Sequence, residues 1–220
     1  MTIAIIVDNG EPLLEKCIES LRNQTERARI IIVGGDKTDY ELAKSLADEV
    51  YGPITSSIGD ARVYGVLKAK GEIIISCDSD TIYPPNYVET MVKGLEEHDF
   101  VKAVTAEPAD GWSDNPVRNF LILFEQRIYP YIPYEHSIAF KKQAFLNEKL
   151  HEINFCMHRE DIAIHMMRKM IPVIPLDIAC YTRMPTNWVI EFFTYGLPVM
   201  SAPMIALSPC VNYLLGFALK

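Results

Sequence analysis

Two carboxylates follow an apolar run in the first half of the chain. Residues 73–80 read Ile-Ile-Ile-Ser-Cys-Asp-Ser-Asp. Residues two apart on an extended backbone point to the same side, so we expect Asp78 and Asp80 to face one pocket at the carboxyl end of a buried strand. Ligands bind at that edge of open α/β sheets. Neighbouring carboxylates repel each other unless a cation lies between them, and oxygen ligands suit Mg²⁺ or Mn²⁺. The alternative is a turn with a helix cap.

The elements that position this pair alternate along the chain. Apolar runs of strand length lie at 2–7, 29–33, 72–77, 100–105, 137–140 and 173–179. Helical stripes lie between most of them: Leu13, Leu14, Cys17, Ile18 and Leu21; Leu42, Ala43, Leu46 and Ala47; Val63, Val66 and Leu67; Val88, Met91, Val92 and Leu95; residues 117–127; and Ala163, Met166, Met167 and Met170. Strands without polar alternation, separated by amphipathic helices, predict an α/β fold whose mostly parallel central sheet is covered on both faces.

Composition narrows the class of protein. The 220 residues suffice for one large α/β domain or two small ones. A net charge of −8 argues against a nucleic-acid partner, which would need a basic stripe. Residues 2–7 are too short for a signal peptide and lack a basic flank. The five cysteines are odd in number and form no C-x-x-C pair, which predicts free, mostly buried thiols and a cytoplasmic protein: Cys17, Cys77, Cys156, Cys180 and Cys210.

Several motifs occur in an order that resembles a known family. Residues 4–14 are similar to its opening strand and turn, and residues 17–25 to its first helix. Ala61-Arg62, Gly65, Ala69 and Gly71-Glu72 match the helix before its metal motif, Asp78-Ser79-Asp80 matches the DxD motif, residues 84–88 match its continuation, and Arg159-Glu160-Asp161 matches a later Glu-Asp motif. Together these motifs resemble the family 2 glycosyltransferases, which have the GT-A fold, over residues 2–170.

The resemblance implies a GT-A-like, Rossmann-type three-layer α/β/α fold and a metal-dependent, inverting glycosyltransferase that moves one sugar from a UDP- or GDP-sugar. It implies Mn²⁺ or Mg²⁺ on Asp78 and Asp80, with Asp80 as the main ligand and Asp78 on the metal or the ribose. It places Arg62 near the nucleotide; the alternative for Arg62 is a solvated helix face. The residues expected to contact the donor are Val7, Asp8, Asn9, Glu11, Gly34, Asp36, Arg62, Asp78, Ser79 and Asp80.

Asp161 is the candidate catalytic base, since an inverting transfer needs a group that deprotonates the acceptor hydroxyl. It lies in the first turn of the helix expected over 160–170, away from the apolar stripe, and the helix dipole there stabilises a carboxylate. The alternative is that Glu160 and Asp161 only complement the helix N-terminus; Glu160 otherwise orients the acceptor. A second metal site on His158, Asp161 and His165, which share a helix face, is the weaker hypothesis.

Other residues depart from the family pattern. The family's second strand usually ends in Asp-Asp-Gly-Ser, whose first Asp reads the uracil, but this chain has Gly34-Gly35-Asp36-Lys37. Asp36 or Asp39 is the substitute, and the donor base stays open. Thr81 stands where a third acidic residue is common. Residues 182–188 replace the Gln-x-x-Arg-Trp segment, which argues against a processive synthase and leaves Arg183 as a phosphate contact.

We expect one domain over 1–187, with a nucleotide-binding half at 1–106 and an acceptor half at 107–187. The apolar tail, residues 188–220, carries no charge from 192 to 219 and is long enough to span a bilayer, but Pro198, Pro203 and Pro209 interrupt it. The alternatives are peripheral membrane contact, with a lipid-linked acceptor, a homodimer interface, or a packed subdomain.

Two other functions compete with this hypothesis. A sugar-1-phosphate nucleotidyltransferase shares the architecture but needs a glycine-rich, basic phosphate loop after the first strand. Residues 8–11 read Asp-Asn-Gly-Glu and are acidic instead. A non-catalytic nucleotide- or glycan-binding domain of the same fold is the other alternative, and the position of Asp161 relative to the DxD motif would discriminate it.

Overall fold

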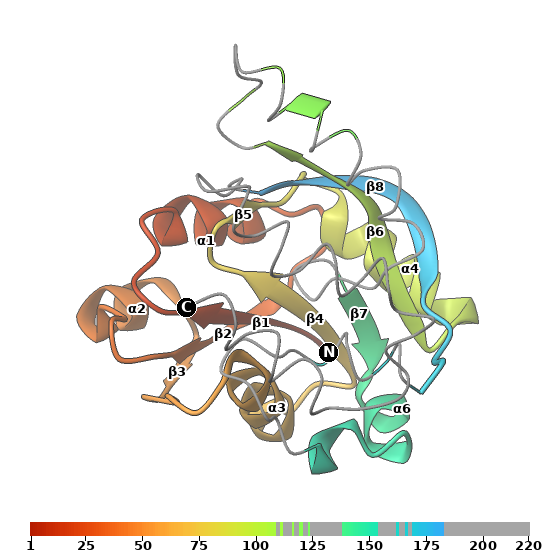
Figure 1. Cartoon of the computed structure of the whole chain (residues 1–220), viewed down its shortest axis with the longest axis horizontal. Helices are drawn as coiled ribbons and strands as arrows, with labels where there is room; N and C mark the ends of the chain where they lie inside the picture. Colours follow the sequence, from red (N-terminus) through yellow and green to blue (C-terminus); the bar gives the residue numbers. More distant parts are fainter. Residues whose placement is uncertain are drawn as a thin grey trace.

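The computed structural model describes residues 1–108, 138–153 and 169–182, together with residues 111, 116, 119, 120, 123, 162 and 166. The described part is a curled sheet with helices on both faces (Figure 1). The strands are β1 (Thr2–Asp8), β2 (Arg29–Gly34), β3 (Glu49–Tyr51), β4 (Ile73–Asp78), β5 (Thr81–Ile82), β6 (Phe100–Pro108), β7 (Ile138–Lys141) and β8 (Ile174–Thr182). The helices are α1 (Leu14–Arg22), α2 (Tyr40–Leu46), α3 (Ile58–Lys68), α4 (Tyr87–Glu97), α6 (Lys142–Asn147) and the 3-10 turn η3 (Leu150–Glu152).

The strand order is β3-β2-β1-β4-β7-β6-β8-β5. The first four strands in this order are parallel, so their carboxyl ends meet at one edge, where Asp8 lies opposite Gly34 and Val7 opposite Asp78. β8 runs parallel to β6, whereas β7 is antiparallel to both of its neighbours and β5 is antiparallel to β8. The predicted mostly parallel sheet is therefore confirmed, with β7 and β5 as the antiparallel members.

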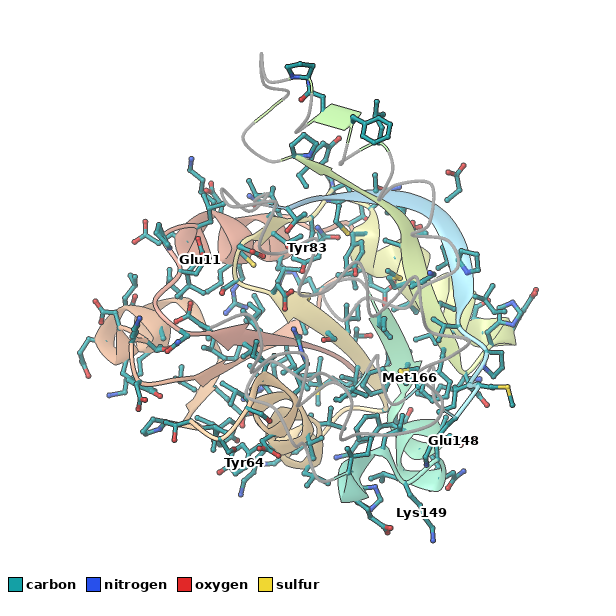
Figure 2. The ribbon with its side chains drawn as sticks, in the orientation of Figure 1. Glu11, Tyr64, Tyr83, Glu148, Lys149 and Met166 are labelled. Atoms are coloured by element: carbon teal, nitrogen blue, oxygen red, sulfur yellow. The ribbon has the colours of Figure 1, made fainter. Side chains whose placement is uncertain are left out.

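Both faces of the sheet are apolar, which explains why its central strands lack polar alternation. In β1, Ala4 and Ile6 pack on the face covered by α1, α2 and α4. Ile3 and Ile5 pack on the other face, covered by α3 and α6. Ile162 and Met166 join that second cluster, and Met166 lies near β7 and α6 (Figure 2). These layers confirm the three-layer α/β/α prediction.

The inward face of α3 differs from the predicted stripe. Val66 is buried as predicted, but Leu67 is 50% exposed, and the other buried positions are two glycines, Ala61 and Arg62. Gly65 lies against the sheet, since a Cβ there would come within 2.7 Å of Ile5 Cγ2. The missing side chain thus lets the α3 backbone approach β1 closely, and Arg62, one turn earlier, reaches the end of β4.

The predicted core position of Met170 is wrong, because that side chain is 88% exposed. Met170 has φ of 52°, and the Ile171 amide donates to the Met166 carbonyl at 3.0 Å, the arrangement that closes a helix at its C-terminus. The helix thus ends before its last predicted core residue. Met166 is buried as predicted, together with Ile162, whereas Ala163 and Met167 lie outside the described residues.

Two short strands, β3 and β5, have no counterpart in the sequence prediction, because runs of three and two residues carry too little periodicity. Among the helices of the described residues, none has the length and apolarity needed to cross a membrane. The tail 188–220 and its membrane, dimer or packing alternatives lie outside the described residues.

Candidate active site

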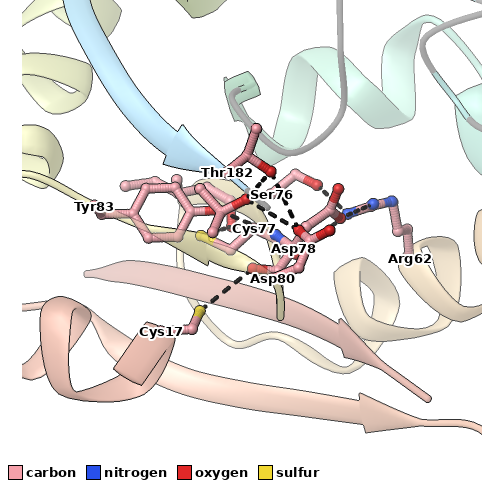
Figure 3. Close-up of polar contacts among 10 residues, drawn as sticks. Cys17, Arg62, Ser76, Cys77, Asp78, Asp80, Tyr83 and Thr182 are labelled. Carbon is pink, nitrogen blue, oxygen red and sulfur yellow. Dashed lines mark hydrogen bonds and ion pairs between the residues drawn. The ribbon is translucent and has the colours of Figure 1, made fainter. Parts of the chain in front are cut away.

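The Asp78-Ser79-Asp80 loop joins the end of β4 to β5, and two buried side chains form hydrogen bonds with its backbone (Figure 3). The Asp78 amide donates to the Tyr83 hydroxyl oxygen at 3.0 Å, and the Cys17 thiol donates to the Asp78 carbonyl at 3.3 Å. Both Tyr83 and Cys17 are buried in the core. The backbone of the first carboxylate is therefore fixed by α1 and by the segment after β5.

Arg62 forms an ion pair with the Asp78 carboxylate from the opposite side of the loop. Its guanidinium also donates to Ser76 Oγ at 2.7 Å and to the Cys77 carbonyl at 3.4 Å. Arg62 is only 5% exposed, so the solvated-face alternative for it is wrong. The side chain of Asp78 remains 31% exposed, which leaves the carboxylate accessible while its charge is balanced by the guanidinium.

Asp80 has different partners. Its Oδ1 lies 3.2 Å from Thr81 Oγ1 and 3.4 Å from Thr182 Oγ1, and the two hydroxyl oxygens are 3.0 Å apart. The hydroxyls of Thr81 and Thr182 can orient the Asp80 carboxylate, whereas a guanidinium pairs with the charge on Asp78. The two carboxylates of the loop are thus chemically unequal.

The donor set fits a small divalent cation. Among the described residues, no cluster of three or more histidine, cysteine or acidic side chains has metal-binding geometry. Mg²⁺ and Mn²⁺ do not need one beside a nucleotide, since they are held by one or two carboxylates together with waters and substrate phosphates. Asp80, with support from Asp78, could supply those carboxylates.

Asp8, at the carboxyl end of β1, is engaged in its own turn. Its carboxylate accepts from the Gly10 amide at 3.0 Å and the Glu11 amide at 3.1 Å, and Asp8 is 1% exposed. The Asp8 carbonyl accepts from the Gly35 amide at 2.8 Å, which links the ends of β1 and β2. Asn9 Oδ1 accepts from the Lys37 amide at 3.0 Å. These contacts make residues 8–11 a rigid rim beside the DxD loop.

At Gly34 the structure excludes a carboxylate in the present conformation. A Cβ there would lie 2.8 Å from the Tyr40 hydroxyl and 2.9 Å from Thr38 Cβ. The Tyr40 hydroxyl donates to the Gly35 carbonyl at 3.2 Å. Of the two proposed substitutes, Asp39 caps α2 by accepting from two of its amides at 3.1 Å, whereas Asp36 is exposed.

The pKa of Tyr40 indicates that Asp36 lies at the same edge of the sheet as Asp8. Burial, followed by the charges of Asp36 and Asp8, raises the pKa of Tyr40. Both carboxylates therefore lie close enough to Tyr40 to disfavour its ionisation, so Asp36 belongs to the same edge as Asp8 and Gly34. Val7 and Glu11, also predicted as donor contacts, are half-buried there.

The described cysteine thiols near the loop are expected to have low reactivity. Cys17, Cys77 and Cys180 are free and buried, as predicted. Burial raises the pKa of Cys77 to about 12, and it also raises that of Cys17 and Cys180. Because the thiolate is the reactive form, these residues act as small core side chains. Cys156 and Cys210 lie outside the described residues.

The remaining predicted site residues are not among those described. Asp161, Glu160, His158, His165 and Arg183 all fall in this group. The described residue next to Asp161, Ile162, packs in the apolar cluster on the α3 side of the sheet. The base therefore stays a prediction, as does the alternative histidine site.

Sequence reasoning did not find Thr182, Tyr83 or Cys17. Thr182 lies 102 residues from Asp80, and no local pattern joins them. Tyr83 and Cys17 look like ordinary core residues, and only the fold brings their polar atoms to the loop.

The model of glycosyl transferase family 2 matches residues 2–154 of the chain. EpsH of Bacillus subtilis (strain 168), named as a glycosyltransferase, is 28% identical over 150 residues, which cover 58% of this chain and 44% of EpsH. The uncharacterized glycosyltransferase YwdF of the same organism is 33% identical over 109 residues, covering 46% and 40%. The chain thus matches less than half the length of these curated relatives.

Solved structures share the fold. The mannosyltransferase PcManGT from Pyrobaculum calidifontis, in complex with GDP-Man and Mn²⁺, is 19% identical with a TM-score of 0.66, covering 98% of this chain and 68% of that one. Residues 1–349 of S. aureus TarS, in complex with UDP, are 16% identical with a TM-score of 0.59, covering 88% and 64%. Because the family model spans more than half of the chain, the protein belongs to glycosyl transferase family 2.

Proposed function

We propose that the chain transfers one sugar from a UDP- or GDP-sugar to an acceptor hydroxyl, with inversion and with Mn²⁺ or Mg²⁺. The observation that carries this proposal is the Asp78-Ser79-Asp80 loop, braced by Arg62 at the carboxyl edge of a family 2 fold. Two structural relatives bind such ligands, GDP-Man with Mn²⁺ in one and UDP in the other.

The proposed roles of Asp78 and Asp80 follow from the negative charge of the donor diphosphate. A bound divalent cation supplies charge neutralisation on the diphosphate as the glycosidic bond breaks. Asp80 would be its main ligand. Asp78, held by Arg62, would contact the metal or the ribose, and the ion pair keeps its carboxylate from rotating away.

The rim around the loop would bind the nucleotide. Asp8 holds its turn in place, so Val7, Asn9 and Glu11 would contact the donor from β1. Gly34 and the exposed Asp36 would line the side of the base, and Ser79 would lie under the diphosphate. Since no carboxylate fits at Gly34 in the present conformation, the choice between uracil and guanine rests on Asp36 or on backbone groups.

Asp161 would remove the proton from the acceptor hydroxyl, a role worth about 10²–10⁴-fold in rate. The acceptor half would comprise residues 107–187 of one domain over 1–187, beside the donor half at 1–106. The tail 188–220 would contact a membrane surface or a second copy, and membrane contact would favour a lipid-linked acceptor.

A donor panel tests the function. UDP- and GDP-sugars are incubated with the chain and Mn²⁺, and released nucleoside diphosphate is measured with and without EDTA. We expect hydrolysis of one donor, lost with EDTA and in Asp80→Ala, but retained in Asp99→Ala, whose carboxylate pairs with Lys141 on the surface. Equal turnover in EDTA would refute the metal role. Pyrophosphate released from a nucleoside triphosphate with a sugar-1-phosphate would indicate a nucleotidyltransferase instead.

The base has its own test once an acceptor is found. Asp161→Asn should bind the donor as the wild type does and lose transfer by at least about 10²-fold. Unchanged transfer would exclude Asp161 as the base.

A further inference from the structure

The carboxylate of Asp80 is tied to a strand that begins almost a hundred residues later. Thr81 Oγ1 and Thr182 Oγ1 both lie within hydrogen-bond distance of Asp80 Oδ1 and of each other, as Figure 3 shows for Asp80 and Thr182. Each hydroxyl has one proton to donate. If Thr81 donates to Thr182 at 3.0 Å, Thr182 is left to donate to Asp80, and one chain of hydrogen bonds accounts for both protons.

The backbone holds these hydroxyls in place. β5 pairs with β8 in antiparallel register, with Thr81 opposite Thr182 and Ile82 opposite Tyr181. Directly opposed residues on neighbouring strands have Cβ atoms about 5 Å apart, which suits a threonine pair. Thr81 is fully buried, so water competes poorly for its hydroxyl.

The charge of the partners matters for a metal ligand. A hydroxyl adds no charge of its own, so Thr81 and Thr182 can orient the Asp80 carboxylate without adding electrostatic competition for a cation. Because the plane of the carboxylate is set before the ion arrives, less rotational freedom is lost on binding.

We propose that Thr182 is a positioning residue that, together with Thr81, orients the Asp80 carboxylate for the divalent cation. This inference rests on the proposed metal-dependent function and extends it to β8. The DxD loop and β8 thus form one unit, in which the position of the strand end at Thr182 sets the geometry of the metal ligand.

The test compares Thr182→Val, which keeps the shape and removes the hydroxyl, with Thr182→Ser, which keeps the hydroxyl. Mn²⁺ affinity is measured by electron paramagnetic resonance of free Mn²⁺, in the presence of UDP and separately of GDP, with no donor sugar. We expect Thr182→Val to weaken Mn²⁺ binding by about 10-fold or more, as for the loss of a hydrogen bond that orients a metal-binding carboxylate, and Thr182→Ser to stay within about twofold of wild type.

Thr25→Val is the matched control, because it removes a hydroxyl that donates to Glu89 at 2.8 Å on the exposed surface. It should leave Mn²⁺ affinity unchanged. Circular dichroism checks that each variant is folded, and Thr182→Ala replaces Thr182→Val if the latter is not.

The outcomes separate the two proposals. Wild-type affinity in Thr182→Val, or equal weakening in Thr182→Ser, would overturn the role of the hydroxyl while leaving the metal site intact. Absence of Mn²⁺ binding to the wild-type chain with either nucleotide would overturn the metal-dependent function, and this inference with it.

Discussion

Lys102 is a buried lysine of the sheet, and its pKa predicts how the free energy of unfolding changes with pH. It lies in β6 opposite Ile138 and is 1% exposed, and burial lowers its pKa from 10.5 to about 8. The folded protein thus binds this proton less tightly than the unfolded chain does. At about 1.4 kcal/mol for each tenfold change in proton affinity, the cost of burying the ammonium is about 3 kcal/mol.

The sign follows from linkage. Below pH 8 the side chain is charged in both states, and the folded state bears the full cost. As pH rises from 8 towards 10.5, the folded state is neutral while the unfolded chain still binds the proton, so the cost fades. With these pKa values it is about 3 kcal/mol at pH 7 and about 1.4 kcal/mol at pH 9.5.

Lys102→Met removes the charge and keeps a flexible side chain of similar length. We expect its stability relative to wild type to be about 2 kcal/mol greater at pH 7 than at pH 9.5. Urea unfolding at both pH values measures the difference. Lys16→Met, on the exposed face of α1, is the control and should show no pH-dependent gain. A stability difference from wild type that does not change between pH 7 and pH 9.5 would refute the reasoning.

Further substitutions test the hydrogen bonds and the ion pair that hold the site, by urea or thermal unfolding. Arg62→Met should cost about 3 kcal/mol, because it leaves the Asp78 carboxylate without its guanidinium. Adding Asp78→Asn should recover part of that loss, and additive effects would show that the ion pair is not coupled. Tyr83→Phe should cost about 1–2 kcal/mol, since the Asp78 amide loses its acceptor; an unchanged midpoint would indicate that water replaces the phenol. Asp8→Ala should cost about 1–2 kcal/mol through the loss of two amide partners, with Asp8→Asn intermediate, and equal losses in both would point to charge rather than hydrogen bonding.

The position of Arg62 shows where sequence reasoning was right and where it needed the fold. The motif order placed it before the DxD loop, and this is where it lies. Whether it faced solvent or the loop depended on Gly65, whose missing side chain brings α3 against β1. Such a close approach depends on the packing of two elements, so the helical pattern alone cannot reveal it.

Gly34 also shows the difference between the residue type, which the sequence gives, and the packing around it, which needs the structure. The sequence reveals that no carboxylate stands at this position. The structure adds that the Tyr40 hydroxyl and Thr38 fill the volume that a larger side chain would need. Packing around Gly34 thus decides which side chains fit there, and the sequence alone does not report it.

The sequence by itself determined the three-layer α/β architecture, because uninterrupted apolar strands require cover on both faces, and it located Asp78 and Asp80 at a strand end, because alternation along a strand is a local rule. Only the tertiary structure decided that the two carboxylates differ. Asp78 meets a guanidinium from α3 and Asp80 meets a hydroxyl from β8. Strand order and helix packing on the sheet determine those partners. Both depend on residues far apart in the chain, so the local spacing of residue types does not predict them.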